Sequence, residues 1–214
     1  MKYIAAAVLA VFAAGCAASQ AEPYDLVLAG GRVIDPETGL DAVMNVAIEG
    51  ERIVAVSTDP LDGDVVKDVS GLIVAPGFID MHAHGQNIPA SRMKALDGVT
   101  TALELESGVL PVAQFYEDSA AEGRPINYGT AAGWAHARIA VLEGVDPAAN
   151  VDWFLQQFSL PAWQETIASQ DQLDAILAEI STGLDEGALG IGILLGYAPE
   201  TGQKEYFAVN ALAA

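Results

Sequence analysis

The chain has 214 residues, enough for one large domain or two small ones, and its 52% hydrophobic content argues against a disordered protein. Asp and Glu number 29 against 9 Lys and Arg, which gives a formal net charge of −20. A chain this acidic repels a phosphate backbone, so no nucleic-acid partner is expected. The acidity is typical of a solvated surface in a salty or extracytoplasmic setting.

The first 21 residues have the pattern of an export signal. Lys2 precedes an apolar run over residues 4–14, which is too short to span a bilayer. The sequence AAGC at residues 13–16 resembles a bacterial lipobox, which predicts cleavage before Cys16. Cys16 is the only cysteine, and it would carry lipid after cleavage. The resulting protein would be a periplasmic lipoprotein anchored to the outer membrane. The alternative is an ordinary signal peptide cleaved after Ala21. Either leader exports the mature chain.

Residues 22–75 alternate short apolar stretches with turn residues, and this rhythm predicts a small β-sandwich. A turn is expected at Gly30 and Gly31. The predicted strands cover residues 26–28, 33–34, 43–48, 53–56, 65–69 and 72–74. After Ala75 strands begin to alternate with helices, as in parallel βα units, so a domain boundary is expected there.

Residues 76–214 are predicted to form four βα units of an α/β domain. The expected strands cover residues 77–82, 100–105, 126–130 and 187–195, and the expected helices cover 91–96, 110–121, a segment after Ser169, and 204–214. Ser169 and Gln172 form a capping-box pattern at the start of the third helix. Four such units correspond to the first half of a TIM-type (β/α)₈ barrel, which takes about 250 residues when complete.

A pair of histidines follows the first strand of this domain. His82 and His84 are two apart, so on a strand their imidazoles point to one face and can meet one divalent ion. They also lie at the carboxyl end of the strand, where barrel enzymes place their sites. The alternative is a pair of hydrogen-bonded surface histidines.

Several motifs together resemble the amidohydrolase superfamily in its N-acyl-D-amino-acid deacylase branch. They are PGFIDMHAH at 76–84, DGVTT at 97–101, GALG at 187–190 and LGYAP at 195–199. The sequences GQN at 85–87, ALELE at 102–106 and NYG at 127–129 resemble members that act on N-acyl-D-glutamate. The resemblance implies a metal-dependent hydrolase of an amide C–N bond, with one or two zinc ions and a small N-acyl amino acid as substrate.

The resemblance also implies further site residues. Where this branch carries a metal-binding cysteine after the second strand, the present chain has Glu106, and a carboxylate can replace a thiolate as ligand. Glu106 is therefore the expected third ligand, with Glu104 as the alternative on the same strand face. Tyr197 resembles a family tyrosine near the substrate carbonyl, or packs in its turn. Arg138 is a candidate for binding a substrate carboxylate, or is an exposed helical arginine.

Two other functions remain open from the sequence. Cyclic-amide hydrolases of the dihydroorotase and hydantoinase type bridge two metals with a carboxylated lysine after the fourth strand, and this chain has no lysine there. The family's remaining histidine ligands and its acid–base aspartate follow later strands, which implies that these 214 residues alone are an incomplete and inactive enzyme. A non-catalytic, lipid-anchored half-barrel that serves as a binding module is the alternative.

Overall fold

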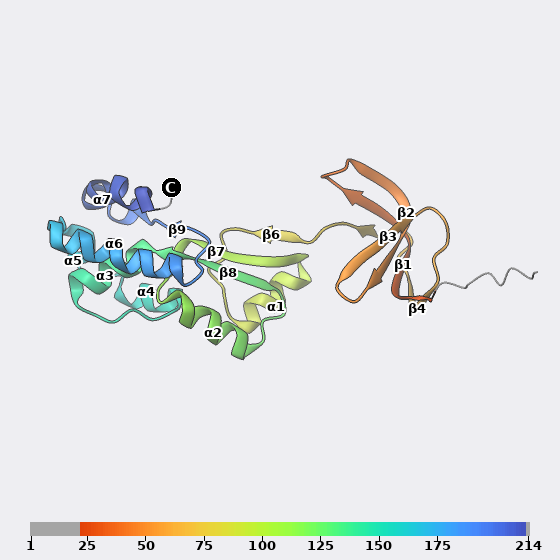
Figure 1. The fold of residues 1–214 in the computed structure, drawn as a ribbon, viewed down its shortest axis with the longest axis horizontal. Coiled ribbons are helices and arrows are strands. Elements are labelled where there is room, and N and C mark those ends of the chain that lie inside the picture. Colours follow the sequence, from red (N-terminus) through yellow and green to blue (C-terminus); the bar gives the residue numbers. More distant parts are fainter. Residues whose placement is uncertain (1–21, 213–214) are drawn as a thin grey trace, which may run out of the picture. The chain divides into compact units, whose positions relative to one another are not determined.

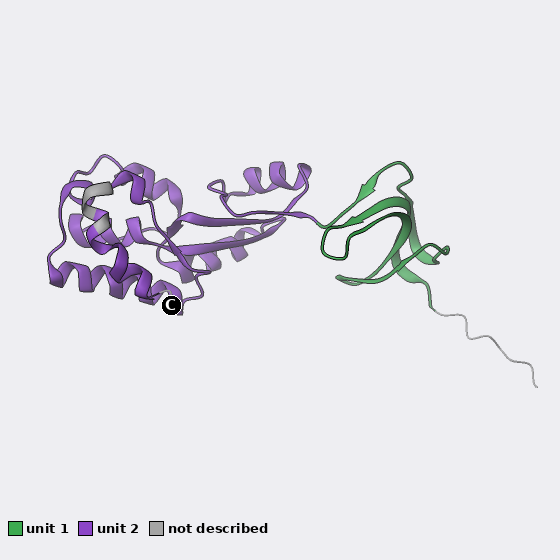
Figure 2. Ribbon diagram, turned by 90° about the horizontal axis from the view of Figure 1, so that it is seen from above, with its two compact units in different colours: residues 1–76 green, residues 77–214 purple. Residues whose placement is uncertain are grey.

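The computed structural model describes residues 22–212, so Cys16 and the predicted leader lie outside the described residues. The chain divides into two compact units, the first ending at Pro76 and the second beginning at Gly77 (Figure 2). The division falls one residue after Ala75, where the sequence pattern changes. In residues 22–212 no helix combines the length and the apolar character needed to cross a bilayer.

Unit 1 is a single five-stranded sheet and not the predicted two-sheet sandwich. Its order is β3-β2-β1-β4, with β5 also paired to β1. The strands are β1 (Tyr24–Asp35), β2 (Leu40–Glu49), β3 (Arg52–Ser57), β4 (Gly63–Asp68) and β5 (Ile73–Val74). All the described strands of this unit therefore belong to one hydrogen-bonded layer.

The reason is a bulge inside β1. The antiparallel register of β1 with β2 shifts between Leu28 and Gly31, and Gly30 has a φ of 73°, a backbone angle that only glycine adopts readily. The expected turn at these glycines is thus a bulge that leaves β1 continuous. The edge of β1 that lies opposite β2 pairs in parallel with β4 before the bulge and with β5 after it. Strand β1 therefore pairs with β2, β4 and β5, and β3 joins the same sheet through β2.

Unit 2 has the predicted alternation of strands and helices. Its four strands are all parallel and follow sequence order: β6 (Phe78–Asp80), β7 (Val99–Val109), β8 (Asn127–Gly133) and β9 (Ile191–Gly192). Its helices are α1 (Ile88–Leu96), α2 (Val112–Glu122), α3 (Trp134–Glu143), α4 (Val151–Gln157), α5 (Ala162–Glu165), α6 (Gln170–Asp185), the short 3₁₀ helix η1 (Leu195–Tyr197) and α7 (Pro199–Leu212) (Figure 1). The chain therefore has a mixed α/β fold.

Two parts of unit 2 differ from the predictions. The fourth strand shrinks from the expected residues 187–195 to the two residues of β9. Three helices, α3 to α5, also occupy the stretch in which the sequence predicted no element. The first six residues of α3 have no exposed polar face, because Trp134, Ala135, His136, Ala137, Arg138 and Ile139 are all buried. A helix buried on every side lacks the 3.6-residue alternation on which sequence prediction depends.

Helix α6 confirms its predicted capping box. The Ser169 Oγ accepts a hydrogen bond from the Gln172 amide at 3.3 Å, and the Gln172 Oε1 accepts one from the Ser169 amide at 3.0 Å. Ile176 and Ile180 on the inner face of α6 join Trp163 and Ile139 in the main apolar core. This core holds the helices against the sheet whose strand ends carry the candidate site.

Candidate metal centre

Backbone pairing brings the segment after β6 next to β7, and these two segments carry the candidate ligands. After β6 ends, the Ala83 amide donates to the Leu103 carbonyl of β7 at 3.0 Å, and His82 forms an isolated β-bridge with Glu104. The His-x-His segment therefore continues alongside β7. This pairing places His82 and His84 next to the two glutamates of β7.

A bulge in β7 gives its two glutamates different positions. Pairing with β8 runs regularly to Glu104 opposite Thr130 and resumes only at Val109 opposite Ala132. Residues 105–108 therefore face the single residue Ala131, and Gly108, with a φ of 62°, completes the bulge. The Glu104 side chain is 0% exposed, whereas that of Glu106 is 39% exposed. Only Glu106 lies at the open surface with the histidines.

Three side-chain atoms converge beyond the ends of β6 and β7. The Glu106 Oε2 lies 2.8 Å from the His82 Nε2 and 3.0 Å from the His84 Nε2, and the two Nε2 atoms are 3.0 Å apart. Neighbouring ligand atoms in a tetrahedral zinc site, with bonds of roughly 2.0–2.1 Å, are separated by about 3.3 Å. Two imidazoles and a carboxylate in this compact triangle fit one divalent ion. Three protein ligands also leave the fourth position open, as catalytic sites do.

Glu104 fixes the orientation of one of these imidazoles. Its Oε2 lies 2.7 Å from the His84 Nδ1, and its Oε1 accepts a hydrogen bond from the Ser107 amide at 3.1 Å. With Nδ1 held by a buried carboxylate, the Nε2 of His84 is the atom that faces His82 and Glu106. The geometry thus separates the two glutamates, which the sequence left as alternatives, into a candidate ligand and an orienting group.

Asp80 stabilises the turn that leads into the histidine pair. Its Oδ1 accepts a hydrogen bond from the His82 amide at 3.1 Å, and the Lys94 Nζ of α1 lies 3.4 Å from its Oδ2. The backbone hydrogen bond, with a smaller contribution from Lys94, holds the pKa of Asp80 below its usual value. One oxygen of the Asp80 carboxylate therefore binds the His82 amide, and the other contacts Lys94 of α1.

Arg138 is not available in the role predicted for it. Its side chain is completely buried in α3, and it donates to the Glu205 carboxylate and to the carbonyls of Trp163 and Thr166. The Trp134 indole donates to the other oxygen of Glu205 at 2.9 Å. Both sequence alternatives, a ligand for a substrate carboxylate and an exposed arginine, are therefore replaced by a buried ion pair that joins α3 to α7.

Tyr197 lies at the end of η1 with about half of its surface exposed. Its ring packs edge-to-face against Phe158, with the ring centroids 5.3 Å apart. This contact agrees with the packing role, which is one of the two roles expected for Tyr197 from the sequence. The exposed half of the ring remains accessible to a ligand.

His136, for which the sequence predicts no role, is completely buried. Its Nε2 lies 3.2 Å from the Asn150 carbonyl, and its ring stacks on Trp153 with the centroids 5.0 Å apart. Burial lowers its pKa from 6.5 to about 4, so the imidazole is neutral at pH 7. The apolar residues on both sides of His136 in the sequence are the only local signal of this burial.

Comparison with known proteins places the chain in a family. The amidohydrolase family model matches residues 65–181, more than half of the chain. The D-aminoacylase of Alcaligenes xylosoxydans xylosoxydans is 29% identical over 192 residues, covering 85% of this chain and 40% of that protein. The N-acyl-D-glutamate deacylase of the same organism is 30% identical over 209 residues, covering 83% and 38%. The chain thus spans about two fifths of the length of these relatives.

The fold gives the same result. A solved structure of D-aminoacylase, described for its binuclear metal centre, superposes with a TM-score of 0.68 at 25% identity, covering 87% of this chain and 42% of that one. The family match, the two relatives and the shared fold agree with the motif resemblance at 76–84. The chain therefore belongs to the amidohydrolase family, in its D-aminoacylase-like branch.

Proposed function

We propose that this protein takes part in metal-dependent hydrolysis of the amide bond of an N-acyl-D-amino acid. The observation that carries the proposal is the convergence of His82, His84 and Glu106 at 2.8–3.0 Å. It combines the donor types that zinc prefers with an open side toward solvent. The names of the two relatives supply the reaction and the substrate class, and they make N-acyl-D-glutamate the first substrate to test.

Each residue of the site has a separate task in this proposal. His82, His84 and Glu106 hold the ion, for which we propose zinc, and Glu104 keeps His84 turned with Nε2 toward it. A bound divalent ion supplies Lewis acidity, which polarises a carbonyl oxygen and lets water attack near neutral pH. The exposure of His82 and Glu106 leaves room for a substrate carbonyl beside the three ligands.

Metal binding is the first test. Calorimetric titration of the metal-stripped 214-residue chain with Zn²⁺ is expected to show a tight site that is lost in His84→Ala and strongly weakened in Glu106→Gln. The matched control is Glu117→Gln, which changes an exposed glutamate of α2 without touching the site. Equal affinity in the chain and in His84→Ala would refute the assignment of the ligands.

Substrate binding at the metal is a second, separate test. Co²⁺ accepts the same nitrogen and oxygen ligands and is paramagnetic, so it broadens the NMR lines of nearby protons. In the Co²⁺-loaded chain the acetyl methyl resonance of N-acetyl-D-glutamate is expected to broaden, and that of the L-enantiomer to broaden less. Absence of broadening for both would exclude an N-acyl amino acid at this site.

Turnover is measured on the same samples by the release of free D-glutamate. The resemblance predicts that these 214 residues alone are inactive. Metal-dependent release that disappears in His84→Ala would establish the reaction and overturn the expected inactivity. Release that persists in His84→Ala or in excess chelator would contradict the proposed role of the metal centre.

A further inference from the structure

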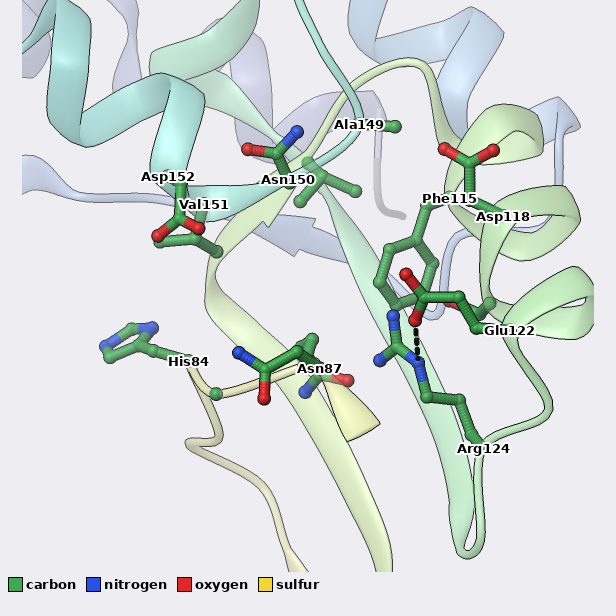
Figure 3. A pocket seen from close by; sticks show the side chains of 14 residues that line it. His84, Asn87, Phe115, Asp118, Glu122, Arg124, Ala149, Asn150, Val151 and Asp152 are labelled. Carbon is green, nitrogen blue, oxygen red and sulfur yellow. Dashed lines mark hydrogen bonds and ion pairs between the residues drawn. The ribbon is translucent and has the colours of Figure 1, made fainter. Parts of the chain in front are cut away.

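A cavity of about 340 Å³ lies in unit 2 alongside α2, with His84 at its edge. Figure 3 shows its lining residues, most of which come from the segment before α1, from α2 and from the loop that leads into α4. The side chains that matter for its chemistry are Phe115, Asp118, Ser119, Glu122, Arg124 and Asp152. None of these is a candidate metal ligand.

Two polar groups in the wall of this cavity are buried without a hydrogen-bond partner. Ser119 is 0% exposed, and its Oγ has no partner among the described residues. The Arg124 side chain is 7% exposed; its Nε donates to the Glu122 carboxylate at 2.9 Å, but its Nη1 has no partner in the described chain. Leaving such a group unsatisfied costs about 1–3 kcal/mol. Both atoms therefore favour an occupant that offers oxygen acceptors.

The outer part of the cavity carries the opposite charge. Asp118 and Asp152 are exposed carboxylates on its rim, while Glu122 is already neutralised by Arg124. A simple anion on Arg124 would be repelled by Asp118 and Asp152, and a simple cation at the rim would leave the Arg124 donor unsatisfied. A ligand with a carboxylate at one end and an ammonium group at the other satisfies both parts.

We propose that this cavity binds a small zwitterion of the α-amino-acid class. Its carboxylate accepts hydrogen bonds from the Arg124 Nη1 and the Ser119 Oγ, and its ammonium group faces Asp118. Ser119 lines the cavity from the buried side of α2 and Asp118 lines it from the exposed side, so a small ligand that carries both charges, such as an α-amino acid, can contact both residues. Phe115 supplies an apolar wall for the rest of the molecule. This site uses no metal and does not depend on the proposed hydrolysis.

The test is ligand-observed NMR saturation transfer on the full 214-residue chain in excess chelator. The probes are alanine as a zwitterion, acetate as an anion without an ammonium group, and methylamine as a cation without a carboxylate. Alanine is expected to bind, and acetate and methylamine to bind at least roughly tenfold more weakly, because each lacks one of the two charge-assisted contacts. Since metal is absent, the outcome is independent of the proposed hydrolase activity.

Matched variants assign the contacts. Arg124→Met and Ser119→Ala are expected to weaken alanine binding by roughly tenfold or more, and Arg124→Lys to retain part of it. Arg92→Met is the control, since Arg92 is an exposed arginine of α1 outside the cavity lining. Ser119→Ala removes a hydroxyl without a partner, so the variant is expected to fold at least as well as the parent.

Three results would overturn the proposal. Failure of all three probes would mean that the cavity holds only water. Equal binding of acetate and alanine would make it an anion site without a role for the rim carboxylates. Alanine binding that is unchanged in both Ser119→Ala and Arg124→Met would place the amino acid elsewhere on the chain.

Discussion

Glu104 and Glu106 are two residues apart on β7, yet they have different neighbours. Glu104 is buried against the His84 Nδ1, whereas Glu106 faces the Nε2 atoms of both histidines. Groups that orient a metal-bound histidine typically affect metal affinity by about 10–100-fold. Glu104→Gln keeps an acceptor but removes the charge, so we expect Zn²⁺ affinity to fall by about tenfold in a competition titration with a chelating dye. Unchanged affinity would show that Glu104 does not orient His84.

His136 makes the stability of unit 2 depend on pH. Its pKa is about 6.5 in the unfolded chain and about 4 when buried, so the unfolded state binds the proton more tightly. The contribution of His136 to the free energy of unfolding is therefore fully present above pH 6.5. It falls by roughly 3 kcal/mol as the pH drops from 6.5 toward 4. Urea unfolding at intervals from pH 7.5 to 4.5 measures this loss.

The control for this prediction is His136→Phe, which keeps an aromatic ring against Trp153 and has no proton to bind. This variant is expected to show a nearly flat stability profile over the same interval. The pKa values of Asp35, Asp41, Asp68 and Asp80 are lowered by their hydrogen bonds. Their contributions are present above the usual aspartate pKa near 4 and are lost below it, so they fall outside the window of His136. An equal loss in His136→Phe would assign the effect to other groups.

At the level of the elements, α3 and α7 are joined by the buried pair of Arg138 and Glu205. Removing one partner of a buried ion pair leaves the other charge uncompensated and typically costs about 3–5 kcal/mol. Glu205→Leu is therefore expected to lower the free energy of unfolding by about that amount. The double variant Arg138→Met/Glu205→Leu removes both charges and is expected to recover much of the loss. A double variant less stable than Glu205→Leu would show that Arg138 has favourable contacts beyond this pair.

The sequence predicted those elements that have a local signal. The alternation of strand and helix after Ala75, the His-x-His pair and the Ser169 capping box all depend on residues close together in the chain. The first six residues of α3 are all buried and leave no amphipathic pattern there, and the buried ion pair of this helix connects residues 67 positions apart. The bulges in β1 and β7 depend on neighbouring strands, so neither the single sheet of unit 1 nor the separation of Glu104 from Glu106 could be derived from spacing alone.

At the scale of the whole molecule, the unfolding of the two units can be followed by different spectroscopic signals. Trp134, Trp153 and Trp163 are the only tryptophans, and all three lie in unit 2 with the candidate metal ligands. Tryptophan fluorescence therefore follows the unfolding of unit 2, whereas far-ultraviolet circular dichroism follows both units. A ligand that binds only the native form of unit 2 will shift the fluorescence transition.

Metal addition is expected to stabilise unit 2 selectively. With free Zn²⁺ at 100 times its dissociation constant, mass action adds about 2.7 kcal/mol to the native state, which raises Tm by several degrees. The fluorescence-detected Tm should rise on Zn²⁺ addition and fall back with excess chelator, while His84→Ala shows no rise because it lacks a ligand. An equal rise in His84→Ala would place the stabilising ion elsewhere. Because unit 1 contains none of the three ligands, a Zn²⁺ effect seen only by circular dichroism would contradict the site.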